Sequence, residues 1–150
     1  ARVMSLQEPT RKMSKSDPTG CVFLMDSPEE ISRKFKRAIT DSDTERCVRY
    51  DPENKPGVAN LMNIYASVTG KSFDEIESEF AGKGYGVFKP AVGDAVIETL
   101  RPIRKEAERI LADKAYLKQV YTDGAMKASS VARKTLRKVY KRVGLVEKPF

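Results

Sequence analysis

A lysine- and serine-rich stretch near the start of the chain carries the clearest chemical signal in the sequence. It reads KMSKS, residues 12–16, and is followed by the turn-forming residues Asp17, Pro18 and Gly20. The stretch is too polar for a core, so we expect a mobile, solvated loop. Two ammonium groups and two hydroxyl groups on such a loop can close over a triphosphate and stabilise the charge that develops on a departing pyrophosphate.

A solvated loop without a ligand is the alternative interpretation of these five residues. The phosphate interpretation is favoured because the complete pentapeptide, its turn-forming flanks and the helical remainder of the chain agree. The chain contains no histidine, which excludes histidine-based nucleophilic triads and proton shuttles. Its two cysteines, Cys21 and Cys47, are too few and too far apart for a disulfide framework or a CxxC metal site. We therefore expect reduced thiols and assign no metal ligands.

Two glycine–lysine stretches resemble phosphate-binding loops only in part. Residues 70–72 match the end of a P-loop, but the position of the first glycine of that pattern holds Tyr65. Residues 82–86 lack the final glycine of a dinucleotide fingerprint and follow no predicted strand. We interpret both as helix-terminating or loop-forming glycines. Within the second stretch and just after it, Lys83 and Lys89 are the groups that a phosphate would meet.

Basic charge concentrates toward the C-terminal end of the sequence. The chain has 28 basic and 21 acidic residues and a net charge of +7, and residues 101–150 hold 14 basic residues against 5 acidic ones. On a helix, these side chains would form a face that can follow a nucleic-acid backbone. An ordinary solvated helix face is the alternative interpretation. The candidate nucleic-acid-binding residues are Arg133, Lys134, Arg137, Lys138 and Lys141.

The elements that position these groups are predicted to be helices, because apolar residues recur every three or four positions along the sequence. Ser27 and Glu30 form a capping box before a helix whose apolar face holds Ile31, Phe35 and Ile39. Further helices are predicted over residues 58–69, ending at Gly70, and after a second capping box at Ser72 and Glu75.

The C-terminal half is predicted to hold longer helices with interruptions. The glycine-rich residues 82–90 are expected to be irregular, and the apolar stripe over residues 92–111 predicts a helix that kinks or breaks near Leu100, since a proline follows there. A short segment leads to Asp123 and Gly124, and the last helix begins after them. Its predicted inward face consists of Ala125, Ala128, Val131, Ala132, Leu136, Val139 and Val143.

Strand signals are nearly absent, since only residues 2–6 and 21–25 look β-like. The predicted fold class is therefore mainly α, a bundle of about five or six helices. No apolar run reaches membrane-spanning length and no signal peptide opens the chain, so we expect a cytoplasmic protein.

KMSKS is the second signature of the class I aminoacyl-tRNA synthetases, which this chain resembles. The resemblance narrows to the bacterial-type tryptophanyl-tRNA synthetases over the strings KMSKSDP, TDSDT, RYDPENKPGVANLMNIYASVTGKS, GKGYGVFK and ETLRPIR. It implies an enzyme that activates L-tryptophan with ATP as an adenylate and then attaches it to tRNA(Trp). It also implies that the helices form an anticodon-binding domain, which would make the basic face a tRNA-binding surface.

The resemblance also implies roles for the loop residues. Lys12, Ser14, Lys15 and Ser16 would contact or position the ATP phosphates, with Lys12 and Lys15 as the catalytic residues, and Met13 would lie near the adenine. Mg²⁺ is implied as the companion of ATP. The attacking group is the carboxylate of tryptophan, so no protein nucleophile is required.

The same resemblance implies that the chain is the C-terminal portion of a homodimeric enzyme. The family's His-Ile-Gly-His signature and most of the tryptophan pocket belong to the preceding portion. Residues 1–25 would be the tail of a Rossmann-like nucleotide-binding fold with the KMSKS loop, and residues 26–150 the anticodon-binding domain. We expect this portion to be inactive alone, whether monomeric or not. The alternatives are a noncatalytic helical RNA-binding or regulatory module derived from a synthetase, and a structural domain whose charge serves solubility.

Overall fold

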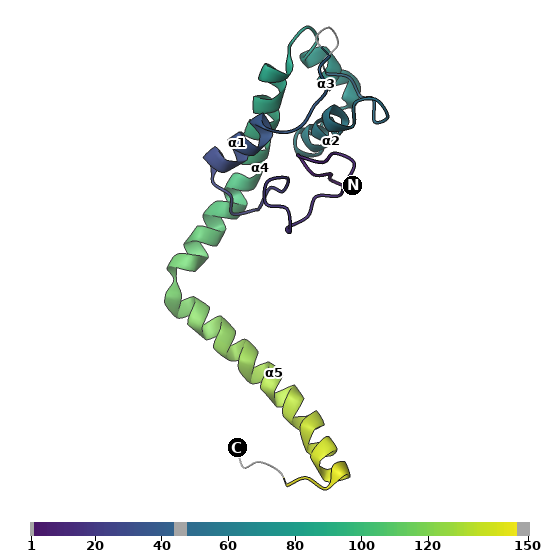
Figure 1. Cartoon of the computed structure of the whole chain (residues 1–150). Coiled ribbons are helices and arrows are strands. Elements are labelled where there is room, and N and C mark those ends of the chain that lie inside the picture. Colours follow the sequence, from purple (N-terminus) through teal and green to yellow (C-terminus); the bar gives the residue numbers. More distant parts are fainter. Residues whose placement is uncertain (1, 44–47, 147–150) are drawn as a thin grey trace. The chain divides into compact units, whose positions relative to one another are not determined.

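The computed structural model describes residues 2–43 and 48–146 (Figure 1). Its elements are α1 (Pro28–Lys36), α2 (Pro56–Thr69), α3 (Phe73–Glu79), α4 (Tyr85–Ala112) and α5 (Lys114–Val143). The described residues form no strand, only an isolated antiparallel bridge between Met4 and Lys12. The predicted mainly α class is therefore confirmed. The chain divides into two compact units, Ala1–Arg104 and Lys105–Phe150, and no helix in the described ranges is long and apolar enough to cross a membrane.

Both predicted capping boxes are present. At α1, the hydroxyl of Ser27 accepts a hydrogen bond from the amide of Glu30 at 3.2 Å, and the Glu30 carboxylate accepts one from the amide of Ser27 at 2.9 Å. Ser72 and Glu75 repeat the pattern at α3, with distances of 3.3 and 2.7 Å. These reciprocal bonds satisfy amides that a helix start otherwise leaves without partners.

The ends of the first two helices differ in how well the sequence predicted them. Helix α2 ends as predicted at Gly70, whose φ of 75° lies in the left-handed region that favours glycine. Helix α1 ends before Ile39, because the amide of Ile39 donates to the carbonyl of Leu6 at 2.8 Å instead of continuing the helix. Ile39 is therefore 48% exposed, and its predicted place on the buried face is wrong.

Helix α4 is longer than predicted. It begins at Tyr85, inside the stretch expected to be irregular, and it continues past Pro102, so that of the predicted kink or break the break is absent. Each proline removes a backbone hydrogen bond, but Pro102 is exposed, so water can reach the carbonyl that loses its partner. At the other end of α4, the fully buried Phe88 packs edge-on against Phe80 and Tyr65. This packing outweighs the glycine-rich composition around it.

Helix α5 also continues through a predicted interruption, at Asp123 and Gly124. A glycine in an exposed helix costs only about 1 kcal/mol relative to alanine, and the long helix on both sides tolerates it. No residue of α5 is buried. Its predicted inward face is exposed, for example at Val131 (67%) and Val139 (47%), because no other element among the described residues of the second unit covers it.

The expected β character of residues 21–25 is wrong. A lone strand has no neighbour to accept its backbone hydrogen bonds. Instead, the amide of Phe23 donates to the carboxylate of Asp26 at 2.9 Å, and Leu24 and Met25 are exposed. Burial raises the pKa of the Cys21 thiol, which is free; Cys47 lies outside the described residues.

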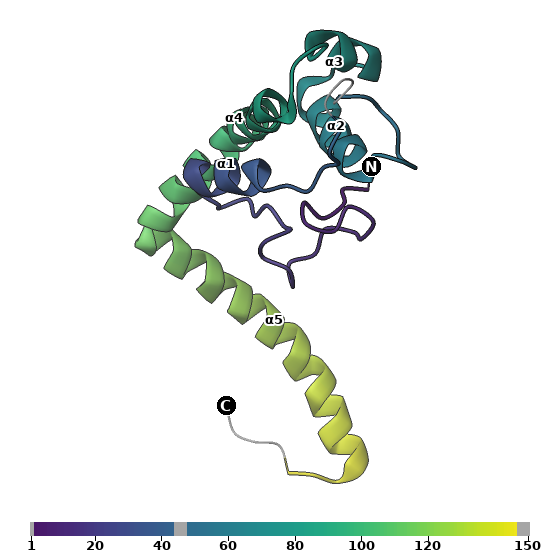
Figure 2. The same cartoon turned by 45° about the horizontal axis from the view of Figure 1, so that its top comes forward.

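The core of the first unit joins the N-terminal segment to the helices. Phe35 of α1 lies against Gly93 of α4, where an added Cβ would come within 3.3 Å of the Phe35 Cβ. Leu6, from the segment before the KMSKS stretch, is 1% exposed within the same core. Figures 1 and 2 both show this purple segment running beside α2. The KMSKS stretch is therefore attached to a packed segment on the surface of α2.

Candidate functional site

The KMSKS loop, residues 12–16, extends from a short backbone ladder. Three hydrogen bonds form this ladder: Ser5 N to Arg11 O at 2.8 Å, Met13 N to Val3 O at 3.1 Å and Leu6 N to Gly20 O at 3.0 Å. They join both ends of the loop to residues 3–6. The backbone at the base of the loop is thus fixed, while its tip extends away from the packed helices.

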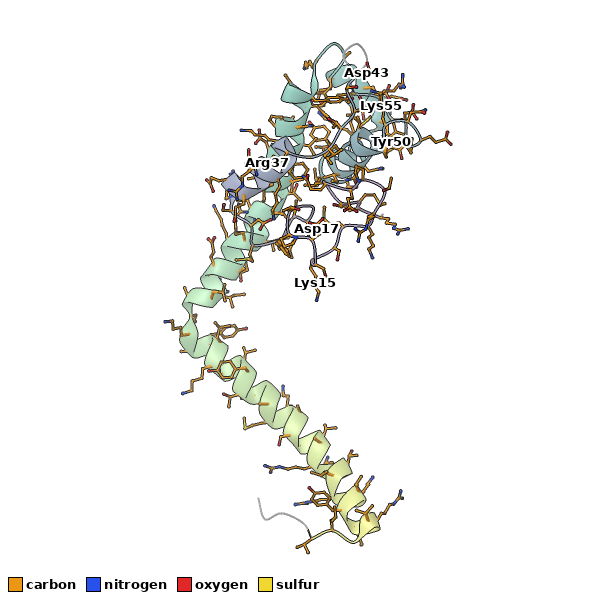
Figure 3. The ribbon with its side chains drawn as sticks, in the orientation of Figure 1. Lys15, Asp17, Arg37, Asp43, Tyr50 and Lys55 are labelled. Carbon is orange, nitrogen blue, oxygen red and sulfur yellow. The ribbon has the colours of Figure 1, made fainter. Side chains whose placement is uncertain are left out.

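The structure brings all five predicted loop residues together on this tip. Lys12, Ser14, Lys15 and Ser16 are exposed, and Figure 3 shows Lys15 projecting from the ribbon. Neither lysine ammonium has a partner within the described part of the chain. Met13 differs, because it is half-buried and packs against the core. The loop therefore presents two unneutralised cations and two hydroxyl groups from an anchored base, which suits a phosphate-rich ligand.

The exit from the loop is held by Asp17. Its carboxylate accepts hydrogen bonds from the hydroxyl of Thr19 at 2.7 Å and the amide of Gly20 at 3.2 Å, and these bonds lower the pKa of Asp17. Gly20 is buried, and an added Cβ would come within 2.1 Å of the Ser5 hydroxyl oxygen and 2.3 Å of the Asp17 carboxylate. A larger residue at this turn would therefore displace the Ser5 and Asp17 side chains.

A second polar cluster, centred on Lys55, was not predicted from the sequence. Lys55 is only 5% exposed, and its ammonium lies 2.8 Å from Asp43, 3.2 Å from Asp41 and 3.3 Å from the Tyr85 hydroxyl. The Tyr85 hydroxyl also donates to Asp41 at 2.7 Å. Figure 3 shows Asp43 and Lys55 close together and well apart from Lys15. The cluster therefore belongs to the scaffold and lies away from the loop.

The electrostatics of this cluster follow from its pairing. Burial by itself would lower the pKa of Lys55, but hydrogen bonds with Asp43, Tyr85 and Asp41 outweigh it and raise that pKa above its ordinary value. Burial and the bond to Asp41 raise the pKa of Tyr85. Lys55 thus stays charged and Tyr85 stays protonated at neutral pH. A signal for this cluster was available, because TDSDT, RYDPENKPG and GKGYG each contribute one part of it.

All five predicted nucleic-acid-binding residues lie on α5, in the second unit, and are exposed. Arg133, Lys134 and Arg137 line one open hollow of about 730 Å³, together with Ser129 and Ser130. The other two predicted residues, Lys138 and Lys141, are not part of this hollow. The helix contains a single acidic residue, Asp123, so basic residues far outnumber acidic ones within it.

The first glycine–lysine stretch serves as a helix boundary, as predicted, whereas helix α4 begins inside the second stretch and includes Gly86. Gly70 ends α2 and Ser72 caps α3. The ammonium of Lys83 lies 5.5 Å from the centre of the Phe80 ring, and Lys89 is half-buried with a pKa that burial lowers. Lys83 therefore contacts an aromatic side chain of the scaffold, and Lys89 is partly enclosed by the scaffold.

Known proteins are similar to this chain along nearly all of its length. The family model for class I tRNA synthetases (W and Y) matches residues 1–101. The tryptophan–tRNA ligase of Clostridium tetani is 50% identical over 148 residues, which are 97% of this chain and 43% of that protein. The corresponding ligase of Oceanobacillus iheyensis is 49% identical over 150 residues, 99% of this chain and 45% of that protein.

A similar solved structure is the tryptophanyl-tRNA synthetase from Campylobacter jejuni complexed with ADP and tryptophan. It superimposes with a TM-score of 0.77 at 26% identity and covers 97% of this chain and 44% of that one. The chain therefore spans less than half the length of the relatives that it matches.

Proposed function

The chain belongs to the class I tRNA synthetases of the tryptophan and tyrosine family, and we propose that it acts as the C-terminal portion of a tryptophan–tRNA ligase. The family resemblance predicted from the KMSKS strings is confirmed. Relatives that are 49 and 50% identical over nearly the whole chain are tryptophan–tRNA ligases, which supports tryptophan over tyrosine as the substrate.

The proposed reaction begins with the activation of tryptophan. A carboxylate oxygen of tryptophan attacks the α-phosphorus of ATP, a new P–O bond forms, and the bond to the pyrophosphate leaving group breaks. Lys12 and Lys15 neutralise the charge that builds on the pyrophosphate, while Ser14 and Ser16 donate hydrogen bonds to it. The observation that carries this proposal is the complete KMSKS loop, with two exposed ammonium groups held on an anchored base.

The remaining assignments rest on the family resemblance. Met13 is proposed to lie near the adenine, and Mg²⁺ to accompany the ATP, with no residue of this chain assigned to hold it. Residues 1–25 are proposed to complete the nucleotide-binding fold, and residues 26–150 to form the anticodon-binding domain. Most of the tryptophan pocket is proposed to lie in the preceding portion of a homodimeric, cytoplasmic enzyme.

Joining this chain to the N-terminal portion of a relative tests the proposed function. The joined protein should catalyse tryptophan-dependent exchange of pyrophosphate into ATP, and the chain alone should not. The alternative, a noncatalytic RNA-binding or regulatory module, predicts tRNA binding by both proteins and exchange by neither. Absence of exchange in a folded, joined protein would reject the ligase assignment.

The basic face of α5 makes a separate prediction about tRNA. Replacing Lys134 or Lys138 with alanine should weaken tRNA(Trp) binding and reduce the slope of log K against log salt concentration by about 1, because each lysine displaces counterions from the RNA backbone. Binding measured over a salt series reports both quantities. Lys118→Ala is the matched control, since Lys118 lies on the opposite side of the same helix at the helical period. Equal slopes in all three variants would exclude this face.

A further inference from the structure

The side chain of Asn60 hydrogen-bonds helix α2 to the segment that carries the KMSKS loop. Asn60 is 4% exposed. Its Oδ1 accepts a hydrogen bond from the amide of Met4 at 3.0 Å, and its Nδ2 donates to the carbonyl of Met4 at 2.9 Å. The carboxamide therefore pairs with both backbone groups of one residue, as a neighbouring strand would.

The residue that Asn60 holds is itself part of the loop base. Met4 pairs with Lys12 in the antiparallel bridge, and the amide of Met13 donates to Val3 beside it. The connection thus runs from α2 through Asn60 and Met4 to the first lysine of the KMSKS loop. A slip of the segment by one residue would break both carboxamide bonds, and it would also move the loop relative to α2.

Other contacts hold the same segment but are less specific for register. Leu6 is buried in the core, and its carbonyl accepts from Ile39. An apolar side chain keeps its burial through small displacements, whereas two hydrogen bonds of opposite polarity to one residue tolerate little displacement. Because Asn60 is buried, losing either bond leaves a polar group without a partner, which is costly.

We infer that Asn60 is a positioning residue, which sets the register of the KMSKS loop against helix α2 and so places Lys12 and Lys15 for the ATP phosphates. This inference rests on the proposed function. Asn60 touches no substrate in this assignment and acts only through the Met4 segment. Small displacements of a catalytic group reduce rates strongly, by up to about 10²-fold for 1 Å.

The decisive variant is Asn60→Asp in the joined, full-length ligase. An ionised aspartate can still accept from the Met4 amide, but it directs a second acceptor at the Met4 carbonyl. At pH 8 we expect pyrophosphate exchange to fall about tenfold or more, with kcat reduced more than the affinity for ATP and with an unchanged KM for tryptophan. A buried carboxyl group facing a carbonyl has a raised pKa, and its protonated form regains a donor. Relative to the wild type, activity should therefore recover as the pH is lowered to 6.

Two comparisons separate positioning from general destabilisation. Asn60→Ala removes donor and acceptor together, so its defect should show no recovery at low pH. Asn63→Asp makes the same change one turn further along α2, at a half-buried side chain with no hydrogen bond among the described residues, and should exchange at the wild-type rate at both pH values. If Asn60→Asp exchanges like Asn63→Asp at pH 8, or if its defect does not depend on pH, the inference is overturned.

Amide hydrogen exchange supplies a readout that does not require activity. In Asn60→Asp at pH 8, the amides of Ser5 and Met13 should exchange faster than in the wild type, while that of Ile31 in α1 should not change. Equal protection of Ser5 and Met13 in both proteins would reject the inference even if activity fell. A wild-type joined protein without exchange activity would instead reject the proposed function.

Discussion

Replacing Lys15 with alanine in the joined ligase should slow tryptophan-dependent pyrophosphate exchange by roughly 10²–10³-fold, the usual cost of removing one group that stabilises developing charge. Lys15 lies at the exposed tip of the KMSKS loop, and its ammonium has no partner within the described residues. It is therefore free to meet the pyrophosphate. Because the leaving group gains charge as the bond to the α-phosphate breaks, the contact is stronger in the transition state than in the bound substrate.

The kinetic pattern distinguishes this role from simple ATP binding. We expect kcat to fall much more than the affinity for ATP, because the lost interaction belongs mainly to the transition state. Lys36→Ala is the control, since it removes the same charge from an exposed position on α1. Exchange by Lys15→Ala within twofold of Lys36→Ala would mean that the loop lysine does not perform the proposed chemistry.

The sequence predicted the features whose hydrogen bonds join residues only a few positions apart. The capping boxes at Ser27 and Ser72 and the helix stop at Gly70 are of this kind, because donor, acceptor and backbone conformation all lie in one short stretch. The polarity and turn-forming flanks of the KMSKS stretch likewise predicted an exposed loop, and the structure places its lysines and serines in solvent. Local chemistry was therefore sufficient for these features.

The contacts that fix the loop base and the scaffold could not be predicted in the same way. Asn60 bonds to Met4 across 56 positions of sequence, and Tyr85 bonds to Asp41 across 44. The spacing of apolar residues along the sequence does not predict contacts between positions so far apart. The family strings contain three of these four residues, Asn60, Tyr85 and Asp41, but not Met4. A string also shows only that a residue type occurs at a position and does not show what it contacts.

The incorrect helix boundaries have a shared physical reason. Pro102 and Gly124 are unfavourable within a helix by local propensity, and propensity alone predicts interruptions near both. Both residues nevertheless lie within continuous helices, and the burial of Phe88 supports the glycine-rich start of α4. The apolar stripe of α5 was recognised correctly, but a stripe does not specify what covers it.

Replacing Lys55 with methionine should lower the free energy of unfolding by about 3 kcal/mol, because removing one partner of a buried ion pair leaves the other uncompensated. Methionine keeps the length of the apolar stem but removes the ammonium that lies 2.8 Å from Asp43 and 3.2 Å from Asp41. It also removes the contact with the Tyr85 hydroxyl at 3.3 Å. Urea unfolding followed by circular dichroism measures the difference.

Lys71→Met is a closely matched control. The ammonium of Lys71 lies 2.8 Å from Glu79, the same distance as that between Lys55 and Asp43, and both carboxylates are 34% exposed. The two lysines differ in burial, with side chains that are 41% and 5% exposed. Exposed pairs contribute at most about 1 kcal/mol, so the control should cost no more than that. Equal losses in the two variants would show that the burial of Lys55 does not matter.

The pH dependence of the Lys55 effect has a defined sign. Burial alone would raise the pKa of Asp41, but hydrogen bonds from Tyr85, the Asp43 amide and Lys55 hold it below its ordinary value. The stabilisation from Asp41 is therefore present above its unfolded-state pKa of about 3.9 and is lost as the pH falls. The raised pKa of Lys55 preserves its contribution up to about pH 10. The difference in free energy of unfolding between wild type and Lys55→Met should stay constant from about pH 5 to pH 9 and shrink below about pH 4. A difference that persists undiminished in acid would contradict the pairing of Lys55 with Asp41.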